Sequence, residues 1–83
     1  MKNKILINLY IVEIDEEYNV WVPVNEYIGK AIEGIIKSAF EIADVTPSKE
    51  YYYLINPENG VLYQNSQLLR DSDIKNAKKV FLI

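Results

Sequence analysis

The spacing of hydrophobic residues changes once along the chain, and this change constrains the fold more than any other feature. Within residues 4–14 and 18–24, apolar side chains alternate with less apolar ones, a period of two that is typical of strands with one face on a core. Residues 25–44 instead repeat apolar side chains every three or four positions, which predicts one amphipathic helix. Because the helix can bury its stripe only across one face of the sheet, the pattern predicts an α+β fold.

The two period-two segments should pair as an antiparallel hairpin around a short acidic loop at residues 15–17. Pro23 has no N–H for a strand ladder, so the second strand should lie at a sheet edge or end there. The residues expected to face the core are Ile5, Ile7, Leu9 and Ile11 from the first strand and Tyr18, Val20 and Val22 from the second.

The predicted helix has a buried stripe and a charged far side. Asn25 is the expected N-cap, because its side chain can accept a hydrogen bond from a free N–H of the first turn. Pro47 should lie beyond the helix, since proline disfavours a helical residue before it. Gly29 and Gly34 each weaken a helix by about 1 kcal/mol relative to alanine; close packing and simple tolerance both explain them. The stripe consists of Ile28, Ile32, Ile35, Ala39 and Ala43, with Ile36 and Ile42 at its margins, and the far side carries Lys30, Glu33, Lys37 and Glu41.

The second half of the chain should add further strands and one helical turn. Residues 51–55 are rich in aromatic and β-branched side chains and predict a strand, followed by a turn at 56–60 and a short return strand at 61–63. Asp71 or Ser72 should then cap a single turn that buries Ile74.

The closing segment, residues 78–83, predicts a strand with Val80 and Leu82 on one face and Phe81 and Ile83 on the other. The first and last strand segments are the most apolar on both faces, so they should be central and parallel. This order of elements is a β-grasp: a mixed four- to five-stranded sheet with one helix on one face. We expect residues 1–83 to form a single domain of this kind.

The order of the C-terminal residues resembles the ubiquitin family, in which a leucine, an aspartate-containing turn, a buried isoleucine and a closing strand follow one another, here as Leu69, Asp71, Ile74 and Val80 to Leu82. The segment YNVWVP, the isoleucine spacing over residues 28–35 and a chain that ends inside its last strand resemble more closely the YukD/EsaB group of ubiquitin-like proteins. The resemblance implies a cytoplasmic accessory component of a type VII secretion system of Gram-positive bacteria, with a membrane component of that system as a protein partner.

The composition argues against several classes of function. The chain has no cysteine and no histidine, which removes thiolate catalysis and the commonest general base and metal ligand. A net charge of −3 disfavours a nucleic-acid or anionic-membrane surface, and no apolar run approaches the roughly 18 residues of a membrane span. We therefore expect no enzyme activity, no cofactor, no nucleic acid and no membrane insertion.

Three clusters that suggest chemistry have simpler explanations. Asp71 and Asp73 lack the glycine-turned loop of a calcium site and fit a helix cap with a solvated neighbour. The acidic residues 15–17 belong at a solvated hairpin tip, where a catalytic carboxylate pair would not have its pKa values separated. Residues 51–53, three tyrosines, lack the interleaved basic residues of a nucleic-acid stacking surface. The sequence therefore predicts no catalytic residue and no metal site.

The apolar side chains of opposite strand parity are the candidate protein-binding surface. If Val80 and Leu82 face the helix, their strand neighbours face the uncovered side of the sheet. Exposed apolar patches of more than a few hundred Å² mark contact sites; the alternative is that loops fold over them. The candidate residues are Phe81, Ile83, Ile55, Tyr53, Trp21 and Tyr10, of which Ile55 matches, by the resemblance, the isoleucine at the centre of ubiquitin's recognition patch.

The leading prediction is thus a non-catalytic protein-interaction module that serves type VII secretion. The alternative is a regulatory subunit or inhibitor domain that plugs a partner enzyme through the same face, and a homodimer through that face is left open. Ubiquitin and its sulfur-carrier relatives act through a flexible Gly-Gly tail. Because Ile83 directly follows the strand, we expect no conjugation of this protein.

Overall fold

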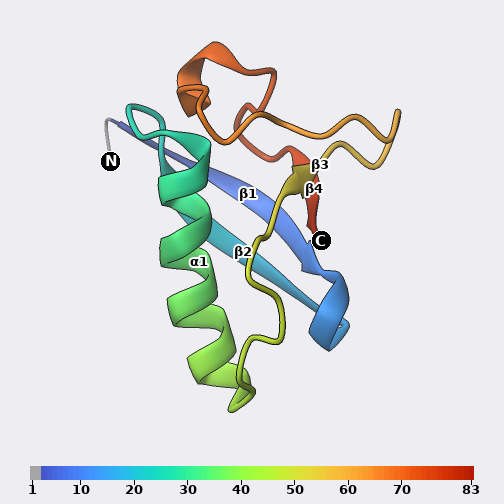
Figure 1. Ribbon diagram of the computed structural model, residues 1–83. Helices are drawn as coiled ribbons and strands as arrows, with labels where there is room; N and C mark the ends of the chain where they lie inside the picture. The colour runs from blue at the N-terminus through green and yellow to red at the C-terminus, as the bar shows by residue number, and fades with distance from the viewer. Residues whose placement is uncertain (1–2) are drawn as a thin grey trace.

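The computed structural model describes residues 3–83, in which one α-helix covers one face of a four-stranded sheet (Figure 1). β1 and β4 are parallel neighbours at the centre, and β2 and β3 pair antiparallel with them at the two edges. The predicted β-grasp, its parallel central strands and the position of β2 at an edge ending at Pro23 are confirmed. The strands are β1 (Lys4–Ile11), β2 (Glu16–Pro23), β3 (Leu54–Ile55) and β4 (Lys79–Leu82), in the order β2-β1-β4-β3.

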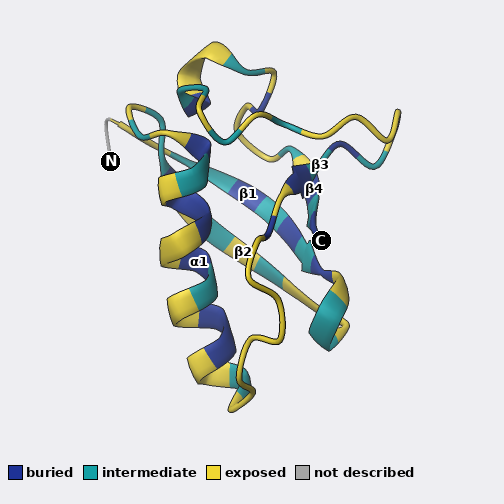
Figure 2. Cartoon of the chain, viewed as in Figure 1, coloured by how far each residue is buried: buried dark blue, intermediate teal, exposed yellow. Residues whose placement is uncertain are grey.

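The sheet buries its inner face as the alternation predicts. Leu9, Ile11 and Val80 are fully buried, and Leu82 is 1% exposed. Figure 2 shows the buried side of the helix α1 (Ile28–Ala43) turned toward this face. The core therefore lies between one helix and one sheet face, and no helix formed by residues 3–83 lies over the other sheet face.

The buried stripe of α1 differs from the prediction at its C-terminal end. Ile42 is 75% exposed, and Phe40 is buried in its place. Because an α-helix has 3.6 residues per turn, the buried stripe drifts gradually around the helix. In the last turn the stripe faces residues 45–53, which follow the helix, and Phe40 packs edge-to-face on Tyr52 with ring centroids 5.8 Å apart. Of the predicted stripe, Ile28, Ile32, Ile35 and Ala39 are buried, and Ala43 is half-buried.

Asn25 is not the N-cap of α1, so this prediction is wrong. The N-cap is Tyr27, which makes no side-chain capping bond. The free N–H groups of Ile28 and Gly29 instead donate to the backbone carbonyls of Gln67 and Asn65, at 2.9 and 3.0 Å. A distant loop therefore satisfies the helix start that a local side chain was expected to cap.

The hairpin loop lies earlier in the chain than expected, at residues 12–15 in place of 15–17, because β1 ends at Ile11 and does not continue to residue 14. The 3₁₀ turn η1 (Val12–Ile14) and Asp15, in the left-handed region with φ of 51°, reverse the chain. Glu16 and Glu17 therefore belong to β2, where they pair with Ile11 and Tyr10.

The C-terminal half contains less strand than expected. Only Leu54 and Ile55 form β3. Residues 45–53, which were expected to supply part of this strand, instead connect the end of α1 to the sheet edge opposite β2. The predicted return strand reduces to one bridge between Ile55 and Leu62.

The predicted cap at Asp71 or Ser72 is likewise misplaced. The 3₁₀ turn η2 (Leu69–Asp71) begins after Leu68, and no side chain caps it. The Ser72 hydroxyl instead accepts a hydrogen bond from the N–H of Ile74. Ile74 itself is 1% exposed, as predicted.

Candidate protein-binding surfaces

Five of the six predicted binding residues are adjacent on the sheet face opposite α1. Phe81 of β4 lies between Tyr10 of β1 and Ile55 of β3 in the strand register. One step further along, Tyr53 and Ile83 exchange two backbone hydrogen bonds of 2.9 Å. We call Tyr10, Tyr53, Ile55, Phe81 and Ile83 the outer cluster.

The side chains of the outer cluster are partly accessible. Tyr10 and Phe81 pack edge-to-face with ring centroids 5.1 Å apart, which fixes both rings. Tyr53 is 38% exposed, and the other four members are half-buried, whereas Val80 and Leu82 on the opposite parity are buried. The outer cluster is therefore an apolar surface whose members cover one another only in part.

Polar groups border the outer cluster at the β2 side. The Tyr10 hydroxyl donates a 2.5 Å hydrogen bond to Asp15, and this bond raises the pKa of Tyr10 above its ordinary value. Lys79 and Glu17 form an ion pair of 3.6 Å across β1. Together with Phe81 these residues line a shallow hollow, and an apolar centre with a polar border is the usual composition of a protein interface.

Trp21, the sixth predicted residue, lies apart from the outer cluster. Its register partner is Leu6, two positions along β1 from Asn8. Asn8 pairs with Asn19 on one side and Lys79 on the other, and its side-chain amide donates to Asn19 at 3.2 Å. A polar row therefore separates Trp21 from the outer cluster, although Trp21 is 54% exposed.

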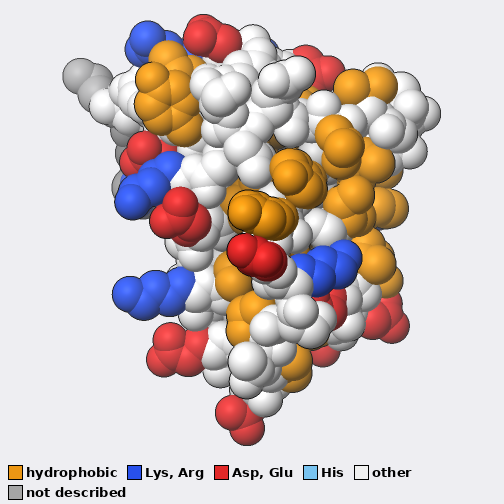
Figure 3. Space-filling model, viewed as in Figure 1, with side chains coloured by type: hydrophobic (Ala, Val, Ile, Leu, Met, Phe, Trp, Pro, Cys, Tyr) orange, Lys and Arg blue, Asp and Glu red, His pale blue; other side chains and the backbone are white. Residues whose placement is uncertain are grey.

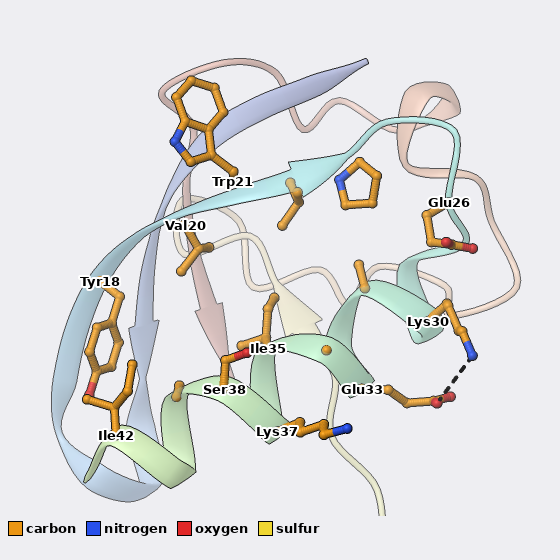
Figure 4. Close-up of a pocket in the computed structure, with 15 residues that line it drawn as sticks. Tyr18, Val20, Trp21, Glu26, Lys30, Glu33, Ile35, Lys37, Ser38 and Ile42 are labelled. Atoms are coloured by element: carbon orange, nitrogen blue, oxygen red, sulfur yellow. Dashed lines mark ion pairs between the residues drawn. The ribbon is translucent and has the colours of Figure 1, made fainter. Parts of the chain in front are cut away.

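A second hollow, which sequence reasoning missed, lies between α1 and the β2 edge (Figure 4). This groove has a volume of about 730 Å³. Tyr18 and Val20 point from β2 toward α1, where Ile42 approaches Tyr18, and Trp21 points to the other side of the strand. The one sequence signal for the groove is Gly34, whose missing side chain leaves space: a Cβ built there meets no atom within 4 Å.

A hydrogen-bonded cluster around Glu13 holds the segment 45–53 against η1. Its carboxylate accepts bonds from the Tyr52 hydroxyl at 2.6 Å and from the Ser48 N–H and hydroxyl at 3.0 and 2.9 Å. The hydrogen bond from Tyr52, and after it the bonds from Ser48, lower the pKa of Glu13 below its ordinary value. The pKa of Tyr52 is raised, mainly by burial and secondly by its hydrogen bond to Glu13. Each group has its partners inside the molecule, which indicates a structural role.

The residues considered for chemistry are dispersed. Asp73 accepts a 2.6 Å bond from the Tyr63 hydroxyl, and Asp71 ends η2. Tyr52 is buried while Tyr51 is 68% exposed, so the tyrosine run offers no continuous stacking surface. Within residues 3–83, no three or more Asp or Glu side chains gather to hold a metal ion, and no helix is long and apolar enough to cross a bilayer.

Comparison with known proteins identifies the fold through structure alone. No protein-family model matches the sequence, and no curated protein sequence matches it significantly. The ubiquitin-like domain of the Mycobacterium tuberculosis type VII secretion system protein ECCD1 is similar with a TM-score of 0.74 and 12% identity, over 96% of this chain and 97% of that one.

Two larger assemblies contain chains with the same fold. A chain of the MycP5-free ESX-5 inner membrane complex aligns with a TM-score of 0.77 and 12% identity, over 98% of this chain and 21% of that one. A chain of a toluene 4-monooxygenase complex with the inhibitor 4-bromobenzoate aligns with a TM-score of 0.81 and 10% identity, over 95% of both chains. At such low identities the likeness establishes a ubiquitin-like β-grasp fold, found both in type VII secretion components and in an oxygenase complex.

Proposed function

We propose that this chain is a non-catalytic, cytoplasmic ubiquitin-like module that binds a membrane component of a type VII secretion system, as an accessory protein of the YukD/EsaB kind. The outer cluster is the observation that carries the proposal: an apolar, aromatic-rich surface on the sheet face that α1 leaves uncovered. Aromatic anchors dominate the binding energy of protein interfaces. The ECCD1 domain and the ESX-5 chain support the secretion context, because both have this fold.

The same surface supports a second candidate function. A chain of the toluene 4-monooxygenase complex shares the fold over almost its whole length. In this alternative, the protein is a regulatory subunit that covers a site on a partner enzyme through the outer cluster. Both functions are non-catalytic for this chain, and they differ in the identity of the partner.

Replacing Phe81 with lysine tests the binding surface. Loss of a central aromatic anchor costs about 2 kcal/mol of binding energy or more, about thirtyfold in affinity. Because Phe81 is half-buried on the outer face and belongs to neither the helix nor the inner face, Phe81→Lys should retain a cooperative thermal transition. Ser66→Lys, in an exposed loop on the α1 side, adds the same charge and should bind as the unmodified protein does.

Affinity capture from the native host, with quantification by mass spectrometry, measures the outcome. The proposal expects a secretion-system membrane component with the unmodified protein and with Ser66→Lys, and its loss with Phe81→Lys. Capture of an oxygenase or another soluble enzyme in the same pattern would favour the alternative. Equal capture by all three proteins would remove the outer cluster as the binding surface.

A further inference from the structure

The outer edge of β2 carries unpaired backbone hydrogen-bonding groups. In an antiparallel ladder, residues bonded to the partner strand alternate with residues whose N–H and C=O point away from it. The N–H of Val24 donates to the carbonyl of Asn3 at 2.8 Å, and this pair continues the β1–β2 register. Counting by twos along β2, the N–H and C=O groups of Glu17, Asn19 and Trp21 therefore point to the free edge.

The other side of β1 confirms this count. Asn8 pairs with Asn19, so its backbone groups should also point away from β2, and its N–H donates to the carbonyl of Lys78 at 2.9 Å. Leu6 pairs with Trp21, and its carbonyl accepts from the N–H of Ala77 at 2.7 Å. Among the strands of the described residues 3–83, none pairs with the outer edge of β2.

The free edge has exposed apolar side chains on both of its faces. Trp21 is 54% exposed on the outer face, and Ile42 is 75% exposed on the helix side, beside the groove. Natural proteins usually protect long edge strands with charged side chains, proline or a bulge, but in β2 the charged residues are confined to Glu16 and Glu17 at one end and the proline to the last position at the other. An added strand would satisfy the edge and cover both exposed side chains.

The charges at the ends of the groove select the kind of strand that fits. Glu16 begins β2, and Glu26 lines the opposite end. Between them, Lys30 and Glu33 pair with each other at 3.9 Å, and Lys37 adds a positive charge. Figure 3 shows charged side chains of both signs along the α1 side of the molecule.

The last turn of α1 adds to the negative character at the Glu16 end. This turn contains Glu41 and no basic residue, so nothing balances the negative end of the helix dipole. Both ends of the groove are therefore acidic, and the net charge of the chain is −3. An occupant with basic residues at its two ends complements this pattern.

We propose that the β2 edge binds an extended segment of another protein as an added strand, with alternate apolar side chains in the groove and a basic residue at each end. This site differs from the outer cluster because it consists of the backbone edge of β2 and the groove on the α1 side; Glu17 borders the outer cluster with its side chain and contributes only its backbone groups to the edge. A second copy of the chain fits less well. Antiparallel self-pairing centred on Asn19 places Glu16 and Glu17 of each copy opposite Val22 and Trp21 of the other, and because β2 contains no basic residue, a second copy brings no positive charge to either acidic end.

Binding of a synthetic peptide tests the site. The probe is acetyl-Lys-Thr-Val-Thr-Val-Thr-Val-Thr-Lys-amide, in which the lysines and the valines lie on the same face of the strand, titrated into the labelled protein and followed by amide-resolved NMR. We expect the largest shifts at the N–H groups of Glu17, Asn19 and Trp21. Two control peptides should each bind at least about tenfold more weakly than the lysine-ended peptide: one with glutamate at both ends, and one with N-methyl groups on the amides that face the edge.

A matched pair of variants separates the groove from the fold. Gly34→Gln places a side chain in the groove where a Cβ meets no atom within 4 Å, so the protein should stay folded while peptide affinity falls about tenfold. Ser66→Gln introduces the same side chain outside the groove and should bind normally.

The proposal would be overturned by shifts confined to the outer cluster, by equal affinity for the lysine and glutamate peptides, or by unchanged peptide affinity of Gly34→Gln. Sedimentation must also show a monomer without peptide, since a dimer closed through the edge would make a second copy the occupant.

Discussion

Alanine substitution of the two glycines in α1 should have opposite effects. At Gly34, an added Cβ meets no atom within 4 Å. At Gly29, it would lie 3.0 Å from the Cβ of Asn65 and 3.2 Å from the Asn65 carbonyl oxygen. Gly29 is therefore explained by close packing against Asn65, whereas the space around Gly34 would also accommodate a larger residue.

The expected magnitudes follow from these contacts. Replacing an exposed glycine with alanine inside a helix stabilises a protein by about 0.5–1 kcal/mol. For a domain of this size, 1 kcal/mol raises the melting temperature by about 4–8 °C. Gly34→Ala should therefore raise the melting temperature by several degrees.

Gly29→Ala should show no such gain. Its Cβ would press against backbone that cannot move freely, because the Gly29 N–H donates to the same Asn65 carbonyl at 3.0 Å. Moving the loop away would lengthen this bond and the neighbouring bond from Ile28 to Gln67, on which the helix start depends. The melting temperature should stay unchanged or fall.

Thermal and urea unfolding followed by circular dichroism measure both effects. The unmodified protein and Ser66→Ala serve as references, since Ser66 is exposed in the loop beside Asn65. Equal stabilisation by both glycine substitutions would refute the reasoning, because it would mean that residues 65–67 do not seal the start of α1. A loss of stability in Gly34→Ala would show that the groove is narrower than described.

Two further predictions concern the core and the Glu13 cluster. Ile35, only 7% exposed, lies on the buried stripe. Ile35→Asp should unfold much of the population, because an unpaired buried carboxylate costs several kcal/mol against a total stability of about 4–12 kcal/mol. Lys37→Asp, on the exposed side of the helix, should leave the melting temperature almost unchanged, and equal melting temperatures for the two variants would contradict the helix orientation. The pKa of Glu13 lies below its ordinary value of 4.5, so its contribution to stability is present above that value and is lost as the pH falls through the lowered pKa. Glu13→Gln should therefore flatten the acid side of a stability–pH profile, whereas Glu50→Gln, which replaces an exposed glutamate, should leave that side steep.

Residue parity carried most of the fold prediction. The alternation at Val80 and Leu82 fixed which face of β4 is buried, and the helical period identified Ile32 and Ile35 as core residues. Hydrophobic burial acts along the whole chain, so its pattern can be read locally. The capping of α1 could not be read in this way, because the groups that accept its N–H bonds lie almost forty residues away, at Asn65 and Gln67.

The surfaces required information that parity does not contain. Parity correctly assigned Tyr10 and Phe81 to one face, but their contact depends on the register between strands that lie far apart in the sequence. The same register places Asn8 beside Lys79 and so separates Trp21 from the outer cluster. The groove depends on where the stripe of α1 turns away from the sheet, which leaves Ile42 exposed.

The two surfaces can be occupied together only if their partners approach in different directions. Adjacent strands lie about 4.8 Å apart, so the edge of β2 is about 10 Å from β4 at the centre of the outer cluster. A standard interface covers about 800 Å² on each partner, a large share of the 5319 Å² that this protein exposes. A globular partner bound to the outer cluster would therefore also extend over β2, on the sheet face opposite α1. An added strand lies in the plane of the sheet and projects little beyond it, so an extended segment is the occupant that leaves the outer cluster accessible. We therefore expect the lysine-ended peptide to shift the edge amides of β2 equally well when a partner covers Phe81, and competition between the two would place both on one surface.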